Sequence, residues 1–511
     1  MKKIFLKFFP IFFVCNLYLT AQTNLSQSDQ IQIKSNLEFL ASDELQGRNA
    51  ASPMERIASN FIATEFMKYG VDPFGDDGTY FQNFKVHSYY NDPGSKIVIT
   101  SDDSSNNLEL NLGYDCAALL NLSINPEVVN KQFDLVFVGY GITAPEYGYD
   151  DYSDIDVTGK IVIAYPDEPH STDENFFSGM ELTEYSGFNS KLRNALKKGA
   201  AGILIIPGDD LLPIWHILRK QSLERKMLTD NGAVSGRKIA PPIAILSPEI
   251  IDGIFAGEEF SYFQINKIAE SGKSPSAFKM KKKVSFDIKT KESDAVARNV
   301  VGIIEGTDPE LKDEYIVLGA HYDHVGMLGE EIYNGADDNG SGTVAVMEVA
   351  KKLAEKKSNK RSIIVALFTA EEKDLNGSKW LSEHLDSSKV AAMVNIDMCG
   401  RGSIDSISTL GAGISSKELN DIVHEINASS TNFVITEIEE HLDEADHYPF
   451  FLKGIPVVTF YDAMEEDLHK TTDDTWKINF PKVFKTVYLV ESIVLRLAND
   501  FRKPAYTYKD E

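Results

Sequence analysis

Cysteine is scarce in this chain. The sequence of 511 residues contains three cysteines, Cys15, Cys116 and Cys399, whereas small folds built on disulfides are dense in them. A disulfide scaffold is therefore excluded, and stability must come from a buried apolar core together with any bound metal. Apolar residues make up 43% of the chain, and a chain of this length is expected to form two folded units.

Positive charge is also in short supply. Lysine and arginine number 51 against 77 aspartates and glutamates, which gives a formal net charge of −26. Nucleic acids and anionic membranes select proteins with clustered cations, so we expect neither as a partner. The basic stretch at residues 277–291 is interpreted as a solvated face or a connector.

The apolar run at residues 4–18 is too short for a membrane span. Lys7 and Pro10 interrupt it, and a spanning helix needs about 20 apolar residues. Two lysines precede the run, and Ala21 closes a stretch suited to signal peptidase, so residues 1–21 are predicted to be a cleaved signal peptide. We therefore expect an exported protein, periplasmic or secreted, with no stable membrane insertion after cleavage.

The rest of the chain divides into regions of different texture. Residues 30–41 and 52–70 have the apolar spacing of amphipathic helices. Short β-like runs follow, and residues from about 115 to 290 form a separate β-rich unit with one or two helices. From residue 299 onward, near-continuous apolar runs alternate with helical stretches. This alternation predicts an α/β sandwich whose sheet is covered on both faces.

Candidate metal ligands follow these apolar runs. Ligands bind beyond the carboxyl ends of strands in open α/β sheets. The run at 315–320 leads into His321 and Asp323, whose side chains point the same way on extended backbone, so that the carboxylate can orient the imidazole. Asp338 comes next, in a glycine-rich acidic loop that feeds a helix. Its carboxylate can approach the same point as His321.

The three later runs end in similar chemistry. The run at 361–369 leads into Glu371 and Glu372, and because adjacent side chains diverge, one can bind a metal while the other accepts a proton from bound water. The third run ends at Asp397, and the fourth leads through a short acidic loop to His469. So many carboxylates at one sheet edge would repel each other. A pair of divalent cations accounts for these carboxylates better than a surface ion-pair network does. The mixed set of histidine and carboxylate ligands is best suited to zinc.

With these residues in place, the sequence resembles metallopeptidase family 28, which comprises co-catalytic zinc aminopeptidases and their carboxypeptidase relatives. It is similar to the bacterial branch that carries a protease-associated insert. The motifs that carry the resemblance are residues 40–48, 137–142, 159–162 and 319–324, together with Asp338-Asn339, Glu371-Glu372, Asp397 and His469. The resemblance implies a three-layer α/β/α zinc-exopeptidase sandwich with a mixed, mostly parallel sheet.

The resemblance also implies a division of the chain and a role for each ligand. The signal peptide would be followed by the first part of the peptidase domain (22–114), the protease-associated insert (115–290) and the main catalytic part (291–511). His321 and Asp397 would bind one ion, Glu372 and His469 the other, and Asp338 would lie between the two ions. Glu371 would be the general base and Asp323 would support His321. Peptides would be the substrates.

Substrate-binding residues are less well defined by the motifs. Asp446 and His447 match the family pattern and are expected at the rim of the substrate pocket, although a helix cap and a surface histidine would explain them equally well. Many relatives have tyrosine where this chain has Leu468, so the metal alone or another group, such as Tyr461, would stabilise the oxyanion. The insert is interpreted as a lid over the cleft, with a packing module as the alternative.

Several functions fit this site. An aminopeptidase is favoured, because a carboxypeptidase or dipeptidase needs cations, typically arginine, to hold a terminal carboxylate. Arginine is sparse near the ligand motifs, where only Arg401 occurs, although Arg193 or Arg219 could reach over from the insert. A metal-free binding protein conflicts with the complete set of ligands and base. Transfer or cyclisation chemistry at a single zinc conflicts with the two histidines and the bridging aspartate. The sequence does not define the oligomeric state.

Overall fold

The computed structural model describes residues 25–508 except 93, 102–106, 119–130, 209–210, 224–225, 230–240, 440–441 and 463–465. The predicted signal peptide lies outside the described residues. Among the described helices, none combines the length and apolar character that crossing a membrane requires.

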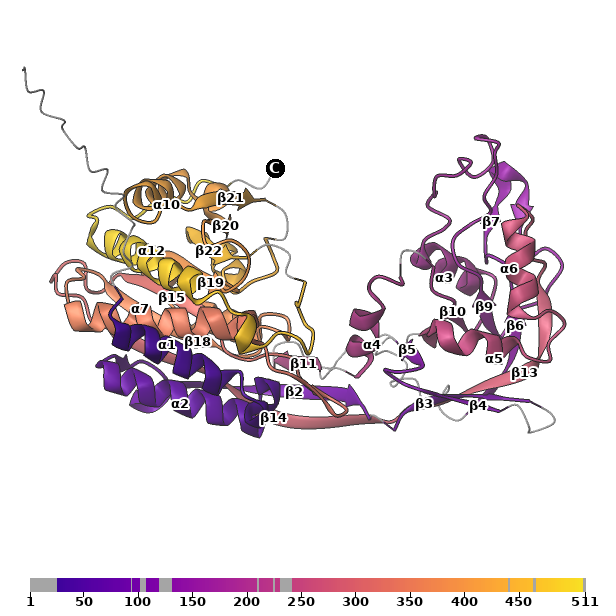
Figure 1. The fold of residues 1–511 in the computed structure, drawn as a ribbon, viewed down its shortest axis with the longest axis horizontal. Coiled ribbons are helices and arrows are strands. Elements are labelled where there is room, and N and C mark those ends of the chain that lie inside the picture. The colour runs from indigo at the N-terminus through magenta and orange to yellow at the C-terminus, as the bar shows by residue number, and fades with distance from the viewer. Residues whose placement is uncertain are drawn as a thin grey trace, which may run out of the picture.

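A ten-stranded sheet forms the larger of two units (Figure 1). Its strand order is β11-β2-β14-β18-β15-β19-β22-β20-β21, and β1 pairs with β14. The strands are β1 (Asp72–Pro73), β2 (Phe81–Asn91), β11 (Lys226–Thr229), β14 (Thr290–Ile304), β15 (Tyr315–His321), β18 (Ser362–Phe368), β19 (Val390–Asp397), β20 (Ser406–Leu410), β21 (Val434–Ile438) and β22 (Val457–Tyr461). The four central strands β18, β15, β19 and β22 are parallel, while β14 and β20 pair antiparallel at their sides.

Helices cover both faces of this sheet. Side chains alternate along each strand, so Leu318 of β15 points to one face and Val317 to the other. The first face is covered by α1 (Gln27–Leu40), α2 (Pro53–Tyr69), α7 (Gly342–Lys356), α9 (Ala412–Ser415), α10 (Lys417–Ser430) and α12 (Phe480–Asn499). The second face is covered by α8 (Asn376–His384) and α11 (Tyr448–Phe451). The predicted α/β sandwich with a mixed sheet is therefore confirmed.

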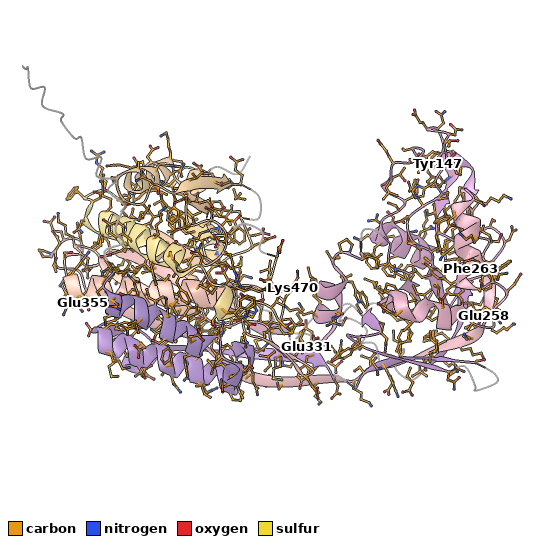
Figure 2. All side chains as sticks on the ribbon, in the orientation of Figure 1. Tyr147, Glu258, Phe263, Glu331, Glu355 and Lys470 are labelled. Carbon is orange, nitrogen blue, oxygen red and sulfur yellow. The ribbon has the colours of Figure 1, made fainter. Side chains whose placement is uncertain are left out.

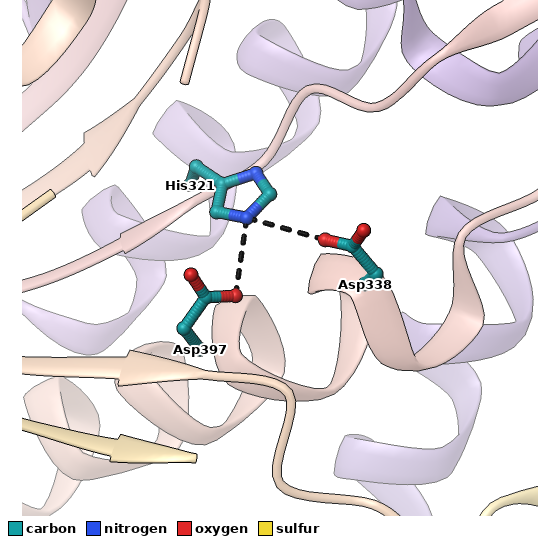
Figure 3. A group of neighbouring side chains, drawn as sticks. All are labelled: His321, Asp338 and Asp397. Carbon is teal, nitrogen blue, oxygen red and sulfur yellow. Dashed lines mark hydrogen bonds and ion pairs between the residues drawn. The ribbon is translucent and has the colours of Figure 1, made fainter. Parts of the chain in front are cut away.

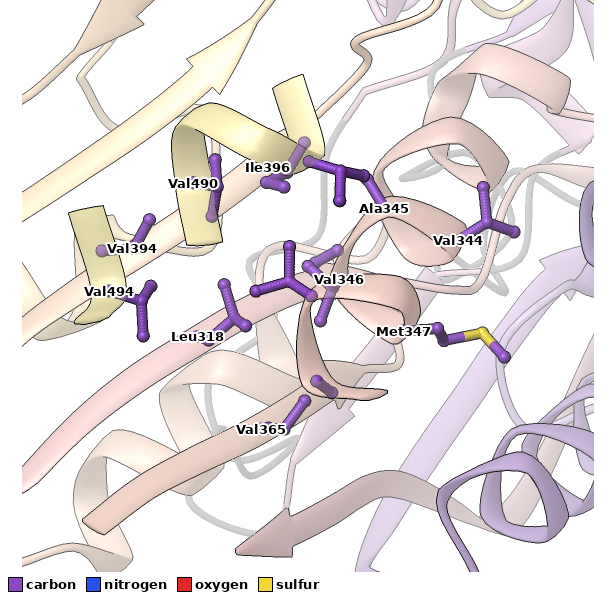
Figure 4. Close-up of a cluster of buried hydrophobic side chains, with 14 of the residues drawn as sticks. Leu318, Val344, Ala345, Val346, Met347, Val365, Val394, Ile396, Val490 and Val494 are labelled. Carbon is purple, nitrogen blue, oxygen red and sulfur yellow. The ribbon is translucent and has the colours of Figure 1, made fainter. Parts of the chain in front are cut away.

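The main core lies between α7, α12 and the parallel strands (Figure 4). Val346 of α7 and Val490 of α12 are fully buried, as are Leu318 and Val394 of the strands beneath them. Burial of branched apolar side chains on both sides of this interface supplies most of its stability. It also fixes the strand ends, which lead into the candidate metal ligands.

An eight-stranded sheet forms the second unit, in the order β4-β3-β13-β6-β9-β10-β12-β5. Its strands are β3 (Lys96–Thr100), β4 (Leu108–Asn111), β5 (Cys116–Ala118), β6 (Gln132–Phe137), β9 (Ile161–Ala164), β10 (Gly202–Ile205), β12 (Ile243–Leu246) and β13 (Phe278–Asp287). The helices of this region are α3 (Phe188–Lys197), α4 (Trp215–Leu223), α5 (Ile251–Phe255) and α6 (Tyr262–Glu270). Two small hairpins complete the fold, β7 (Thr143–Ala144) with β8 (Tyr149–Asp150), and β16 (Gly326–Leu328) with β17 (Glu331–Tyr333).

Three strands near the expected boundaries pair with the sheet of the other region. β3 and β4 precede residue 115 but pair within the second sheet, whereas β11 lies inside 115–290 and pairs with β2 of the first. The division at residues 115 and 290 and the protease-associated character of the insert stay predictions. The basic stretch at 277–291 largely forms β13, in which Lys279, Lys281 and Lys283 face outward.

We predict that Leu318→Ala lowers the free energy of unfolding by about 2–5 kcal/mol, because it leaves a cavity in a fully packed core. Leu318 has no exposed surface. Denaturant unfolding measures the change. Ile31→Ala on α1 is the control, because that side chain is 59% exposed and its loss is expected to change the free energy by less than about 0.5 kcal/mol. Equal effects of the two substitutions would contradict the placement of the core.

Candidate metal centre

Three parallel strands deliver the predicted ligands to one edge of the sheet. β15 ends at His321 and β19 ends at Asp397, and Glu371 and Glu372 follow the end of β18 closely. In the register of the sheet, His321 lies opposite Phe368 of β18. The carboxyl ends therefore coincide, which is where ligands bind in open α/β sheets.

One donor group gathers around His321 (Figure 3). Its Nε2 lies 3.2 Å from Asp397 Oδ1 and 3.3 Å from Asp338 Oδ1. The three donor atoms are close enough to share one ion. On the other side of the ring, Nδ1 lies 3.2 Å from the backbone carbonyl oxygen of Asp323 and 3.8 Å from its carboxylate. The backbone oxygen of Asp323 is thus a closer partner of the imidazole than the carboxylate that was expected to orient it.

The second donor group shares Asp338 with the first. Nε2 of His469 lies 3.1 Å from Asp338 Oδ2 and 3.1 Å from Glu372 Oε2. Nδ1 of His324 lies 2.7 Å from Glu372 Oε1 and 3.6 Å from Asp338 Oδ2. Because Oδ1 of Asp338 faces His321 and Oδ2 faces this group, Asp338 has the geometry of a carboxylate that bridges two ions.

His324 was not among the residues expected to bind metal. It follows Asp323 directly, and its fully buried ring lies beside Gly335, where any added Cβ would collide with it. Its spacing of three residues from His321 was the available sign that it could bind metal. At this spacing the two side chains point the same way only if the chain turns after β15. The structure makes this turn, so both imidazoles reach the same carboxylates.

The loop that carries Asp338 is held by its own set of hydrogen bonds. The backbone N–H groups of Asp337 and Asp338 donate to the buried carboxylate of Asp473, both at 3.0 Å. The guanidinium of Arg401 donates to the same carboxylate at 2.6 Å. Asn339 connects the loop to the end of β19, because its Oδ1 accepts the N–H of Met398 at 3.1 Å.

The donor set fits a pair of divalent cations. One donor group contains the imidazoles of His324 and His469, and the other contains that of His321. Carboxylate oxygens complete both groups, and zinc accepts such mixed nitrogen and oxygen donors. Among the described residues, Nε2 of His324 has no hydrogen-bond partner, and Nδ1 of His324 and Oε1 of Glu372 have none besides each other. Buried polar atoms are normally satisfied, so these atoms are consistent with ligation.

Comparison with known proteins identifies the family of one part of the chain. Residues 299–493 match the sequence model of peptidase family M28. These residues belong to that family. The match contains every candidate ligand and the residues between them, and it confirms the family resemblance that the motifs indicated.

Relatives of this chain are named as exopeptidases. Leucine aminopeptidase 1 of Metarhizium robertsii is 26% identical over 47% of this chain and 64% of its own length. Aminopeptidase YwaD of Bacillus subtilis is 24% identical over 71% of this chain and 69% of its own length. A probable glutamate carboxypeptidase, LAMP1 of Arabidopsis thaliana, is 36% identical, but over 21% of this chain and 16% of its own length. The chain thus covers less than two thirds of the length of leucine aminopeptidase 1 and of LAMP1.

Solved structures share the fold over nearly the whole chain. An aminopeptidase from Aneurinibacillus sp. strain AM-1 has a TM-score of 0.60 at 19% identity, covering 94% of this chain and 97% of its own. A zinc aminopeptidase from Bacillus subtilis, BSAP, has a TM-score of 0.57 at 19% identity, covering 94% and 98%. The likeness supports the predicted α/β fold of this chain.

Burial and close carboxylates shift the pKa values of the ligands apart. Burial alone would lower the pKa of His469, but the carboxylates of Glu372 and Asp338 outweigh it and raise the pKa to about 10. The pKa of His321 is likewise raised, against the effect of burial, by Glu371 and Asp397. In the metal-free protein both imidazoles therefore hold protons, and they act as the local counter-charge of the acidic cluster.

Glu371 differs from its neighbour Glu372. Burial raises the pKa of Glu371 well above its usual value, and the nearby carboxylates of Asp397 and Asp446 add to the effect. Its Oε2 lies 3.8 Å from His321 Nε2, and its backbone N–H donates to Asp323 Oδ1 at 3.2 Å. Glu371 is thus oriented beside the donor groups and, like Asp323 and Asp446, is an acidic side chain of raised pKa outside both groups.

The three residues expected to contact substrate differ in burial. Asp446 is fully buried, and burial raises its pKa to about 7. His447 is also buried rather than at a rim, and its Nδ1 lies 2.8 Å from Thr459 Oγ1. Tyr461 ends β22 and is partly buried. Contact of these residues with substrate stays a prediction.

A polar cavity of about 410 Å³ lies beside the loop that carries His469. It is lined by Arg401, Gly402, Ser406, Ile407, Ser408, Thr436, Asp462, Glu466, Asp467 and Lys482. Lys470, adjacent to His469, and Glu331 of β17 lie on the side of the first unit that faces the second (Figure 2). Glu331 meets that unit directly, since Arg219 of α4 lies 3.0 Å from its carboxylate.

We predict that zinc binding at pH 7 releases protons, because the histidine ligands must lose the protons that they hold in the metal-free protein. About one proton is expected from each of His321 and His469, and affinity is expected to fall as the pH is lowered. Calorimetric titration in buffers of different ionisation enthalpy measures the number. The variant His469→Gln should release about one proton fewer. Zinc uptake without proton release would contradict these charge states.

Proposed function

We propose that this protein is an exported, zinc-dependent aminopeptidase that hydrolyses the N-terminal peptide bond of peptides. The observation that carries the proposal is the pair of donor groups that share Asp338, with Glu371 beside them. Relatives named as aminopeptidases and a solved zinc aminopeptidase of similar fold support it. Export rests on the apolar N-terminal run, and N-terminal sequencing of the mature protein would test it.

Each residue of the centre would have a distinct role in hydrolysis. His321 and Asp397 would hold one zinc ion, Glu372 and His469 the other, and Asp338 both. When bound, the ions would make a water molecule more acidic and polarise the substrate carbonyl. Glu371 takes the proton from the attacking water and later gives it to the leaving amine. Burial, with a further contribution from neighbouring carboxylates, raises the pKa of Glu371 in the metal-free protein.

The charge around the centre favours a substrate with a free amino terminus. Glu371, Asp397 and Asp446 place carboxyl groups near His321, and such a surrounding attracts an ammonium group. A carboxypeptidase would need a cation for the terminal carboxylate. Arg401 lies near the ligands, but its guanidinium is engaged by Asp473 at 2.6 Å.

A substrate panel separates the two exopeptidase classes. We expect hydrolysis of amino-acid p-nitroanilides with a free amine, no hydrolysis of amino-blocked dipeptides with a free carboxylate, and loss of activity on chelation. Readdition of zinc should restore the activity. Cleavage of only the amino-blocked substrates would make the protein a carboxypeptidase, and hydrolysis that resists the chelator would refute the metal mechanism.

We predict that Glu371→Gln keeps the ions but lowers turnover by about 10²–10⁴-fold, because the amide cannot accept a proton. Glu372→Gln, the same change one residue along the chain, should instead lose zinc from the group that contains His469. Elemental analysis beside steady-state kinetics distinguishes the two. Loss of zinc in the Glu371 variant would mean that Glu371 is a ligand rather than the base.

A further inference from the structure

An N-terminal turn adjoins two of the chain segments that carry the metal donors. This turn is η1 (Asp43–Arg48) with Asn49, and it lies between α1 and α2. The amide of Asn49 donates to the carbonyl of Val325, and the amide of Asn334 donates to Asp43 Oδ1 at 2.8 Å. The turn thus contacts the segment after β15 and the segment before Asp338, which are adjacent to it although nearly 300 positions away in sequence.

Arg48 makes the central contacts of this turn. Its side chain is 1% exposed. Nε donates to the carbonyl of Tyr322 at 2.8 Å, Nη1 to that of Asn334 at 2.7 Å, and Nη2 to that of Gly335 at 3.0 Å. Nη1 also donates to the carbonyl of Leu40. One planar group therefore joins the residue that follows His321 to the loop that precedes Asp338, and to the end of α1.

The backbone of the turn is shaped for this approach. Gln46, Gly47 and Arg48 all have positive φ, at 46°, 66° and 49°. A Cβ on Gly47 would lie 2.2 Å from the carbonyl oxygen of Tyr333 and 2.7 Å from that of Gly326. Left-handed backbone is costly for residues other than glycine, and the hydrogen bonds of Arg48 and Asn49 offset that cost.

The charge of Arg48 suits its position. Burial lowers its pKa to about 10, against the opposing effect of Asp323, Asp473 and Asp338, so the group remains cationic at neutral pH. A lysine would keep the charge but not the planar set of donors, which is what allows four separate carbonyls to be held in fixed directions. The geometric function of Arg48 can therefore be separated from its charge by experiment.

We infer that Arg48 is a positioning residue of the metal centre, which holds the segments of His321, His324 and Asp338 at the spacing that lets them share ions. The inference rests on the proposed function, because it presupposes that these residues bind metal. Arg48 itself touches neither substrate nor ion. Its effect is expected on zinc affinity, since partners that orient metal ligands typically contribute 10–100-fold to binding.

Arg361 provides a matched control. It is also 1% exposed, and its guanidinium donates to the carbonyls of Leu497, Asp500 and Phe501 and to Glu314. It precedes β18, at the opposite end of the strand from Glu371. Replacing it perturbs a buried arginine with similar partners, but away from the donor groups.

The test compares Arg48→Lys with Arg361→Lys. Both are expected to lower the unfolding midpoint, but only Arg48→Lys should weaken zinc binding, by about 10–100-fold in competition with a chromophoric chelator. Circular dichroism establishes that each variant is folded. Equal zinc affinity in the two folded variants would overturn the inference. If the wild-type protein itself binds no zinc, the proposed function fails instead.

A second pair of variants keeps the test valid should Arg48→Lys not fold. Asp43 is exposed, so its replacement is tolerated by the core. Asp43→Ala removes one of the two acceptors of the Asn334 amide, the other being Asp474, and should weaken zinc binding by about 2- to 10-fold. Asp43→Asn keeps an acceptor oxygen and should bind zinc more tightly than the alanine variant. Wild-type affinity in both variants would show that the turn has no influence on the ions.

Discussion

Repulsion between buried carboxylates is the constraint on which this structure depends. Asp338, Glu371, Glu372 and Asp397 converge where three parallel strands end, and their charges cannot remain uncompensated away from water. Protonated imidazoles balance part of the charge in the metal-free protein. Divalent cations would balance the negative charge fully. The same convergence of carboxylates thus explains both the raised pKa values of the two histidines and the fit of the donor set to metal ions.

The compensating groups come from distant parts of the chain. Arg48 belongs to the N-terminal turn, while Arg401 and Asp473 belong to the C-terminal half, and all of them surround the loop of Asp338. Arg48 donates to backbone carbonyls of that loop, Asp473 accepts from its backbone N–H groups, and Arg401 donates to Asp473. The position of the shared carboxylate is therefore set by tertiary structure and not by local sequence preference.

The sheet and most of the centre could be predicted from the sequence, because buried parallel strands leave continuous apolar runs whose ends are easy to locate. His321, Glu372 and Asp397 follow such runs directly, and their convergence needs only the rule for open α/β sheets. His324 could not be assigned, because its direction depends on the turn that the chain makes after β15. Burial of Asp446 and His447 was missed for a related reason, since neither lies in a periodic segment.

The limits of the second sheet could not be predicted from the sequence. β3 and β4 are short strands with ordinary alternation, and nothing in their sequence indicates which sheet they join. The lysines of β13 mark a strand whose outer face is solvated, and the partner of two of them is Asp134 of the neighbouring strand. Pairing between strands far apart in sequence decides both cases, and a single sequence does not contain that information.

The connection between the two sheets has a consequence for how such a protein is assembled. The chain leaves the first sheet after β2 and returns before β14, and these strands pair along eleven positions from Asn91 and Thr290 onward. At the crossing, the N–H of Asp92 donates to the carbonyl of Lys289 at 2.7 Å. Exit and return are thus neighbours, as in a hairpin whose turn has been replaced by a whole unit. Gain or loss of that unit would leave the register of the peptidase sheet unchanged, apart from its edge strand β11, which makes this part of the molecule modular.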